Sequence, residues 1–429
     1  MTELIDIWKS FGIKFLGLKV EEEGEGRIRW TGILAPLSYL FKLPVIMYLQ
    51  SKLYTGYNVA TWKGKRVASP FAPPVGSRAQ FRALKCIAKS SMLESFPLFR
   101  RSYPLAATLA VTYRCQLNCP HCSAGRRPRK GSAELTTDEM KKVIDESIDI
   151  GLSNITFTGG EPLVRKDIFD LIAHVDGKKA ITSMFTNGLL LTDDVLDKLK
   201  SAGLYSLFVS LDSADAAEHD RLRGHPGSFK AAVDGIERAL SKGMMACISS
   251  YSSRSNVEQH HYERIHKLGK ELGVSMIILF DCVPTGTLLH DTSEMMTFEQ
   301  KQVVGRYNAD AFEKGVNPML ASQAWQNSIE GYLSGIGCLA GHLQYYVSAY
   351  GDVTPCDFSP VSFGNVRQES IKSIWKKIIK HPTYNHISRR CRMQNPSFRQ
   401  QYVDPIPDNT ILPYPIEKLP RLNYRTSKQ

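Results

Sequence analysis

Between residues 106 and 281, short apolar runs alternate with amphipathic segments of helical length. Six runs are predicted as strands, at 106–113, 154–158, 180–185, 204–211, 244–250 and 274–281. Segments at 136–151, 193–202, 228–242 and 257–272 have the apolar spacing of helices, and the first begins with the capping-box pair Thr136 and Glu139. This order predicts an α/β fold in which helices connect parallel strands through right-handed crossovers. In such sheets, ligand-binding side chains collect at the carboxyl ends of the strands.

Three cysteines follow the first predicted strand. Cys115, Cys119 and Cys122 have the spacing C-x3-C-x2-C. Three thiolates on one loop can hold three irons of a 4Fe–4S cluster and leave the fourth iron open to a small molecule. A zinc site or a disulfide framework is the alternative, but structural zinc usually takes paired Cys or Cys/His sets, and this spacing leaves an odd thiol. The ligand count therefore favours an iron–sulfur cluster.

A glycine-rich turn follows the second predicted strand. It has the sequence Gly159-Gly160-Glu161-Pro162. Two glycines let the backbone approach a ligand closely, and the carboxylate of Glu161 suits an ammonium group. An ordinary strand-to-helix turn would explain the same residues. The turn is nevertheless expected at the same edge of the sheet as the three cysteines.

Together, the cysteine motif and this turn resemble the signature of the radical S-adenosylmethionine (SAM) superfamily. The resemblance implies a partial (β/α)6 barrel over residues 105–300, with a 4Fe–4S cluster on Cys115, Cys119 and Cys122. The amino and carboxylate groups of SAM would bind the open iron. One electron would then cleave SAM to methionine and a 5′-deoxyadenosyl radical, which takes hydrogen from a substrate. The longer run at 159–167, GGEPLVRKD, is similar to members that carry a second cluster.

The resemblance also implies SAM contacts along the strand ends. The candidate residues are Gly159, Gly160, Glu161, Pro162, Thr186, Ser210, Asp212 and Arg223. Thr186 and Ser210 would lie near the ribose or the methionine carboxylate, although each hydroxyl could instead cap the next helix. Arg223 is a suitable carboxylate partner, and the alternative is an exposed, solvated arginine. The sequence assigns no catalytic side chain.

A second cysteine pattern lies near the C-terminus, within a predicted module at 301–404. Cys338, Gly351 and Cys356 have the spacing C-x12-G-x4-C, and Cys391 follows. A hairpin turn at the glycine would bring Cys338 and Cys356 together. The pattern resembles the twitch domain, the short form of the SPASM domain, whose further seven-cysteine pattern is not found. The resemblance implies a second 4Fe–4S cluster, which would accept an electron or anchor the substrate. The alternative is three unrelated buried cysteines.

The fourth ligand of that second cluster is left open by the sequence. His386 is one possibility, and direct binding of substrate to the open iron is another. The three remaining cysteines, Cys86, Cys247 and Cys282, are expected to be packing residues. Nine cysteines without a secretory signal in the first 19 residues predict a reducing, cytoplasmic location.

Charge is concentrated in the first part of the chain, where an extension over residues 1–104 is predicted. The formal net charge is +12, and residues 51–130 contain 15 basic residues but only Glu94 as an acid. Just before them, residues 30–51 have Lys42 as their single charge. Pro36, Pro44 and Lys42 weaken a membrane span, so the segment is predicted either to lie peripherally on an anionic membrane surface or to pack on the barrel. A proline-rich tail at 405–429 is predicted to run as an extended strap.

These patterns predict a radical SAM enzyme that takes hydrogen from an unidentified substrate and carries an auxiliary cluster. A peptide or a cofactor precursor is the favoured substrate class, and a lipid or isoprenoid at the membrane surface is the alternative. An electron donor such as flavodoxin or ferredoxin is an expected partner. An iron–sulfur sensor that binds nucleic acid is not favoured, because the basic run lacks a recognisable nucleic-acid-binding fold.

Overall fold

The computed structural model describes the backbone of residues 19–23 and 27–31, together with residues 59–83, 86, 103–326, 337–385, 388 and 390–420. His386 and most of the apolar segment predicted at 30–51 lie outside these residues. Two short hairpins precede the main sheet: β1 (Lys19–Glu23) pairs with β2 (Arg27–Thr31), and β3 (Ala60–Trp62) pairs with β4 (Lys65–Val67). No helix in the described part of the chain is long and apolar enough to cross a membrane.

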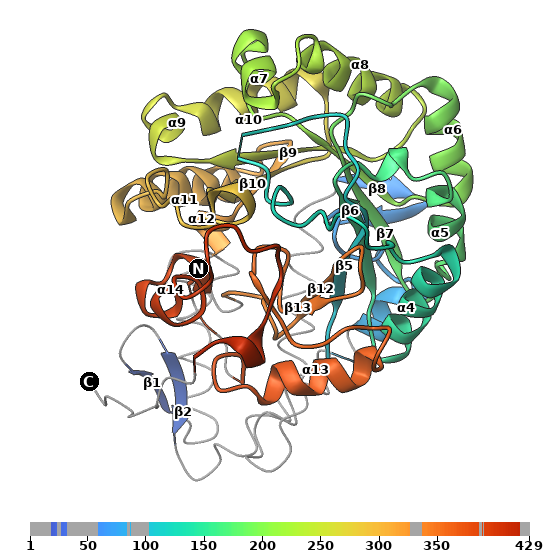
Figure 1. The fold of residues 1–429 in the computed structure, drawn as a ribbon. Coiled ribbons are helices and arrows are strands. Elements are labelled where there is room, and N and C mark those ends of the chain that lie inside the picture. Colours follow the sequence, from blue (N-terminus) through green and yellow to red (C-terminus); the bar gives the residue numbers. More distant parts are fainter. Residues whose placement is uncertain are drawn as a thin grey trace.

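One twisted sheet organises the rest of the molecule (Figure 1). Its strand order is β11-β10-β9-β8-β7-β6-β5-β12-β13. Six neighbouring strands are parallel and follow chain order: β5 (Ala106–Thr112), β6 (Asn154–Gly159), β7 (Ile181–Thr186), β8 (Ser206–Ser210), β9 (Ala246–Ser252) and β10 (Met276–Asp281). The α/β fold with a partial (β/α)6 barrel is therefore confirmed. A seventh parallel strand, β11 (Met319–Ser322), continues the sheet beyond β10.

Helices line the outer side of the sheet (Figure 1). They are α4 (Thr137–Asp149), α5 (Ile168–His174), α6 (Asp193–Ala202), α7 (Ala216–Arg223), α8 (Ser228–Ser241), α9 (Arg254–Glu258), α10 (His261–Leu272), α11 (Phe298–Glu313) and α12 (Gln323–Gln326). The capping box of Thr136 and Glu139 forms as predicted. The helix predicted over 257–272 is present from His261 onward as α10, but its first turn is wrong: α9 and α10 are separate because His260 adopts a left-handed conformation with φ 55°. An apolar pattern does not report such a break.

The core lies between the sheet and these helices. Strand residues Leu109, Ile155 and Phe157 and helix residues Met140 and Ile144 are all completely buried in one continuous apolar cluster. Burial of this surface fixes the register of the parallel strands, because a shift by one residue would turn apolar side chains to the wrong face. The core thereby sets the relative positions of the strand ends.

The C-terminal module extends the other edge of the sheet. The strand β12 (Gln344–Val347) pairs in parallel with β5 and antiparallel with β13 (Val353–Thr354), and Gly351 occupies the intervening turn with φ 90°. The module also contains β14 (Val361–Ser362), α13 (Ile371–Lys380), η4 (Arg392–Gln394) and α14 (Pro396–Tyr402), and β15 (Tyr414–Pro415) follows it. The predicted hairpin is present, and its first strand joins the barrel sheet directly.

The segment at 405–420 runs along both parts of the molecule. Its Leu412 backbone N–H donates to the carbonyl of Arg126 at 2.9 Å, and β15 pairs in parallel with β14. The guanidinium of Arg126 in turn donates to the carbonyls of Pro407 and Thr410, each at 2.9 Å. These contacts fasten the segment after the first cysteine motif to the C-terminal segment.

Candidate active site

The first three cysteines lie on a loop that leaves the carboxyl end of β5. The Cys115 side chain is exposed, Cys119 and Cys122 are half-buried, and all three thiols are free. Burial raises the pKa of the Cys115 and Cys119 thiols, and the nearby Cys122 adds to both shifts. No three His, Cys, Asp or Glu side chains in the described residues converge on a single ion. A 4Fe–4S cluster does not require this, since each cysteine binds a different iron.

Hydrogen-bond donors lie beside the sulfur atoms of this loop. The backbone N–H of Leu117 donates to Cys115 Sγ at 3.4 Å, and Asn187 Nδ2 donates to the same sulfur at 3.8 Å. The guanidinium of Arg223 opposes the rise in the pKa of Cys119. Such donors and charges favour the thiolate, the form that binds metal. The donor set therefore fits an iron–sulfur cluster. Asn187 was missed by the sequence analysis, although it directly follows Thr186.

Asp212 and Arg223 form a buried ion pair beside the cysteine loop. Asp212 is 3% exposed, and its carboxylate lies 2.7 Å from Arg223 Nε and 3.0 Å from Nε2 of His121, which belongs to the loop itself. Burial alone would raise the pKa of Asp212, but Arg223 and His121 hold it well below its usual range. Arg223 is thus not a solvated surface arginine. The pair connects the ends of β8 and α7 to the loop, and its role as a SAM contact stays a prediction.

The two glycines of the turn after β6 allow it to approach the cysteine loop. A side chain on Gly159, whose φ is 141°, would lie 2.0 Å from the carbonyl oxygen of Thr112. One on Gly160 would lie 2.4 Å from the carbonyl oxygen of Arg114. The Gly160 N–H instead donates to Thr112 at 2.7 Å, and the Glu161 N–H donates to Arg114 at 2.9 Å. Both positions thus require glycine at least in part because the turn packs closely against the backbone of Thr112 and Arg114.

Glu161 is completely buried, and its oxygens accept three hydrogen bonds. The donors are the Thr186 hydroxyl and the Asn187 N–H, both at 2.8 Å, and the Leu163 N–H at 3.1 Å. The carboxylate therefore joins the ends of β6 and β7, and Thr186 is occupied with it. Its contact with an ammonium group stays a prediction. Ser210, at the end of β8, is half-buried, and Pro162 begins the short helix η2 (Pro162–Val164).

A Gly159→Ala variant is expected to lose at least about 2 kcal/mol of stability, because the added methyl group meets backbone and φ is unsuited to alanine. Gly177→Ala is the matched control, since nothing lies within 4 Å of the added atom. Chemical denaturation of both variants, followed by circular dichroism, measures the difference. Equal stability of the two variants would contradict the backbone contact.

The loop after β10 contacts the cysteine loop from the opposite side. Thr287 Oγ1 donates to the carbonyl of Pro120 at 2.9 Å, and the Thr287 N–H donates to that of Cys122 at 3.2 Å. Gly286 has φ 56°, and a side chain there would lie 2.3 Å from the Cys122 carbonyl oxygen. The sequence analysis assigned no role to this loop. The only available signal was a glycine shortly after the last predicted strand.

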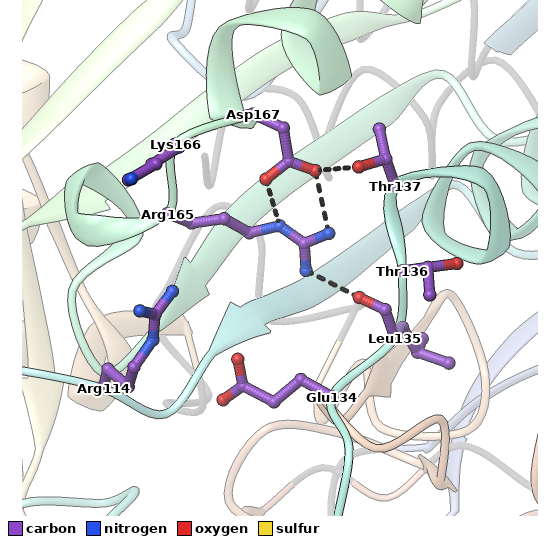
Figure 2. Close-up of a pocket in the computed structure, with 8 residues that line it drawn as sticks. All are labelled: Arg114, Glu134, Leu135, Thr136, Thr137, Arg165, Lys166 and Asp167. Atoms are coloured by element: carbon purple, nitrogen blue, oxygen red, sulfur yellow. Dashed lines mark hydrogen bonds and ion pairs between the residues drawn. The ribbon is translucent and has the colours of Figure 1, made fainter.

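A cavity of about 380 Å³ lies next to the cysteine loop (Figure 2). Arg165 is fixed in its wall: it donates to both oxygens of Asp167, at 2.8 and 2.9 Å, and to the Leu135 carbonyl at 3.0 Å. Arg114 and Lys166 also line the cavity, and both are exposed. Because Arg114 precedes Cys115, a basic side chain lies at the rim next to the exposed cysteine, while the acidic Glu134 and Asp167 line the same cavity.

The C-terminal cysteines also come together. Cys356 and Cys391 are buried, and the Cys338 N–H donates to the Ser388 carbonyl at 2.6 Å. Burial raises the pKa of Cys356, and the charges of Asp357, Cys338 and Cys391 add to the shift. Cys247, by contrast, is completely buried in a separate apolar cluster. All three C-terminal cysteines thus lie in the module as free thiols, and their ligation of a second cluster stays a prediction.

A buried cation, Arg127, borders the C-terminal cysteines. Arg127 is 1% exposed, donates through Nη2 to the carbonyl of Asp357 at 2.5 Å, and lies 4.6 Å from the ring centre of Tyr346. Its buried Nη1 has no acceptor among the described residues. A buried guanidinium N–H without an acceptor is costly. Because Asp357 follows Cys356, this group fits an anionic cluster or a carboxylate bound there.

Comparisons with known proteins identify the family of this chain. The model of the radical SAM superfamily matches residues 109–252, and that of the SPASM iron–sulfur cluster-binding domain matches residues 338–397. An AdoMet-dependent heme synthase of Methanosarcina barkeri is 33% identical over 287 residues, which cover 62% of this chain and 80% of that protein. This chain belongs to the radical SAM superfamily. It is accordingly an enzyme that uses SAM and a 4Fe–4S cluster, with auxiliary iron–sulfur binding in its SPASM domain.

Other relatives of this radical SAM protein differ in how far the similarity extends. A PqqA peptide cyclase of Bradyrhizobium diazoefficiens is 33% identical over 156 residues, or 36% of this chain and 41% of that protein. Among solved structures, Streptococcus suis SuiB has a TM-score of 0.54 at 16% identity. The similarity covers 86% of this chain and 88% of the SuiB chain. The structure of anSMEcpe with bound AdoMet has a TM-score of 0.52 at 17% identity. The similarity covers 66% of this chain and 82% of the anSMEcpe chain. These two structures share the fold.

Proposed function

We propose that this enzyme acts on a cofactor precursor of the tetrapyrrole class. The observation that carries the proposal is the extent of similarity to the heme synthases: it spans 80% of the Methanosarcina barkeri protein, against 41% of the peptide cyclase. A second heme synthase, from Nitratidesulfovibrio vulgaris, is 31% identical over 286 residues. These residues cover 62% of this chain and 77% of that protein. The similarity to this class therefore extends further than that to the peptide cyclase, over more of both proteins.

The residues of this chain would hold and orient the reacting groups. When bound, a cluster on the first three cysteines supplies one electron for SAM cleavage, and a second cluster supplies an acceptor for the electron that hydrogen removal leaves behind. Three contacts hold the cysteine loop in place: the bond from the Glu161 N–H to Arg114, the pair of Asp212 with His121, and the bond from Thr287 to Pro120. A substrate bound at this edge would cover the exposed Cys115 and exclude water, which would protect a reactive intermediate from side reactions.

The charge of the site supports an anionic substrate. Arg127 offers a buried donor without an acceptor among the described residues, close to Cys356. Heme and related tetrapyrroles carry carboxylate side chains, and a guanidinium is well suited to bind such groups. Arg127 would accordingly orient one carboxylate of the substrate near the auxiliary cluster.

The rim of the cavity in Figure 2 supports an acidic electron donor. Arg114 is exposed and directly precedes Cys115, the most exposed of the three cysteines of its loop, and the exposed Lys166 lines the same cavity as Arg114. A flavodoxin or ferredoxin would approach this face, since opposite charge steers association. A reducing, cytoplasmic location fits an enzyme with these clusters. Contact of the N-terminal segment with a membrane surface stays a prediction.

Anaerobic formation of 5′-deoxyadenosine tests the proposed substrate. The assay contains SAM and either dithionite or a flavodoxin system, with one addition per arm: a porphyrin tetracarboxylate with or without iron, a peptide mixture, or a membrane lipid extract. We expect the porphyrin to raise the rate, and deuterium on its side chains to appear in 5′-deoxyadenosine. Stimulation by lipid or peptide alone would overturn the proposal. A lipid effect lost on deletion of residues 1–60 would point to a membrane substrate instead.

A further inference from the structure

The SPASM module of this chain brings three cysteines together, and a 4Fe–4S cluster has four irons to be ligated. We propose that the carboxylate of Asp281 is the fourth ligand of the auxiliary cluster. The ligand would come from the barrel and not from the module, so the cluster would join the two parts of the molecule. The proposal concerns cluster ligation only and holds whichever substrate the enzyme takes.

Asp281 lies at the carboxyl end of β10, where the parallel strands present their functional side chains. It is 4% exposed, and its backbone N–H donates to Oε1 of Gln323 at 3.0 Å. The position of its carboxylate is therefore set by the last strand of the six-stranded barrel. A ligand held on a rigid strand is placed more precisely than one on a loop.

One turn of chain connects this carboxylate to Cys391. The N–H of Gln394 donates to the carbonyl of Cys391 at 3.1 Å, and Gln394 Nε2 donates to Asp281 Oδ2 at 3.3 Å. Lys301, from α11, donates to Gln394 Oε1 at 2.5 Å and lies 3.7 Å from Asp281 Oδ2. Through Gln394, the Asp281 carboxylate is thus two hydrogen bonds away from the backbone of Cys391.

The two oxygens of Asp281 differ in their contacts. Oδ2 has Gln394 and Lys301 as partners, whereas the buried Oδ1 has no hydrogen bond of normal geometry from the described residues, and the backbone N–H of Ala324 is the donor that lies near the carboxylate. An unsatisfied buried carboxylate oxygen is costly, and an iron would satisfy it. Oxygen is an acceptable ligand for iron, and Lys301 with Gln394 would orient the carboxylate as outer partners do in metal sites. A monodentate carboxylate binds metal through one oxygen only, so one occupied and one open oxygen suit this mode of binding.

Spectroscopy and iron analysis test this ligand without reference to turnover. In a background that lacks the first cluster (Cys115, Cys119 and Cys122 all changed to Ala), the auxiliary cluster is observed alone. Asp281→Asn keeps the size of the side chain but removes the charged ligand, so mild oxidation is expected to lower the iron content from roughly four to roughly three per chain. Asp281→Cys should restore four. The control is Asp291→Asn, an exposed aspartate in the next loop, which should leave the cluster unchanged.

Pulsed electron paramagnetic resonance of the reduced protein with native Asp281 distinguishes the other ligands. A carboxylate ligand gives no strong nitrogen coupling, whereas His342, four residues after Cys338, or His386 would give one. Such a coupling, lost on replacement of either histidine, would overturn the proposal. So would an Asp281→Asn protein with unchanged spectrum and iron content. If Asp281→Asn fails to fold, the nitrogen measurement and Asp281→Cys still decide. A porphyrin with no effect in the turnover assay would refute the proposed substrate and leave this result untouched.

Discussion

A Cys119→Ala variant is expected to form no 5′-deoxyadenosine above background. With two thiolates left, the first cluster loses one of its three iron ligands, and SAM has no iron to bind. Anaerobic product analysis by chromatography, with iron determination on the same sample, measures the loss. Cys247→Ala is the control, because that thiol is buried in a separate apolar cluster away from both cysteine groups.

The same assay on Cys356→Ala separates the two cysteine groups. Cys356 lies in the C-terminal module, so its replacement should lower the iron content while part of the SAM cleavage survives. If the iron content of Cys356→Ala equalled that of the unaltered protein, the assignment of a second cluster to the C-terminal cysteines would be wrong. If Cys119→Ala cleaved SAM normally, the assignment of the first cluster itself would fail.

Replacement of Asp212 by Ala is expected to destabilise the protein by about 3 kcal/mol and to weaken SAM binding. The cost arises because Arg223 and His121 remain next to the cysteine loop without their shared acceptor. Anaerobic chemical denaturation of the cluster-loaded protein gives the stability, and equilibrium binding of SAM gives the affinity.

The control for this variant is Asp234→Ala. Asp234 also pairs with two cations, Lys230 and Arg238, but on the exposed surface of α8, where such pairs are worth roughly 0.2–1 kcal/mol. Stabilities of the two variants within about 0.5 kcal/mol of each other would contradict the structural importance of the buried pair. An unchanged SAM affinity in a folded Asp212→Ala protein would remove Asp212 from the predicted SAM contacts.

Local sequence patterns predicted much of the fold. The capping box at Thr136, the end of α6 at Ala202 and the turn glycine at 351 were predictable, because neighbouring residues alone decide them. The division between α9 and α10 at His260 was not predictable, since the apolar spacing runs through it. A left-handed conformation at a histidine depends on the packing of the segments on either side.

The candidate site, like the fold, could be predicted only in part from local sequence. The cysteines, Gly159 and Glu161 were found from the sequence because ligand spacing and backbone freedom are properties of a few adjacent residues. The partners of these residues were not found: Thr287 contacts the cysteine loop from 165 residues away, and Gln394 reaches Asp281 from 113 residues away. The sequence by itself determined the strand–helix order and the cysteine sets. Only the tertiary structure decided which side chains meet around them, because those contacts depend on the strand register that burial of the whole core imposes.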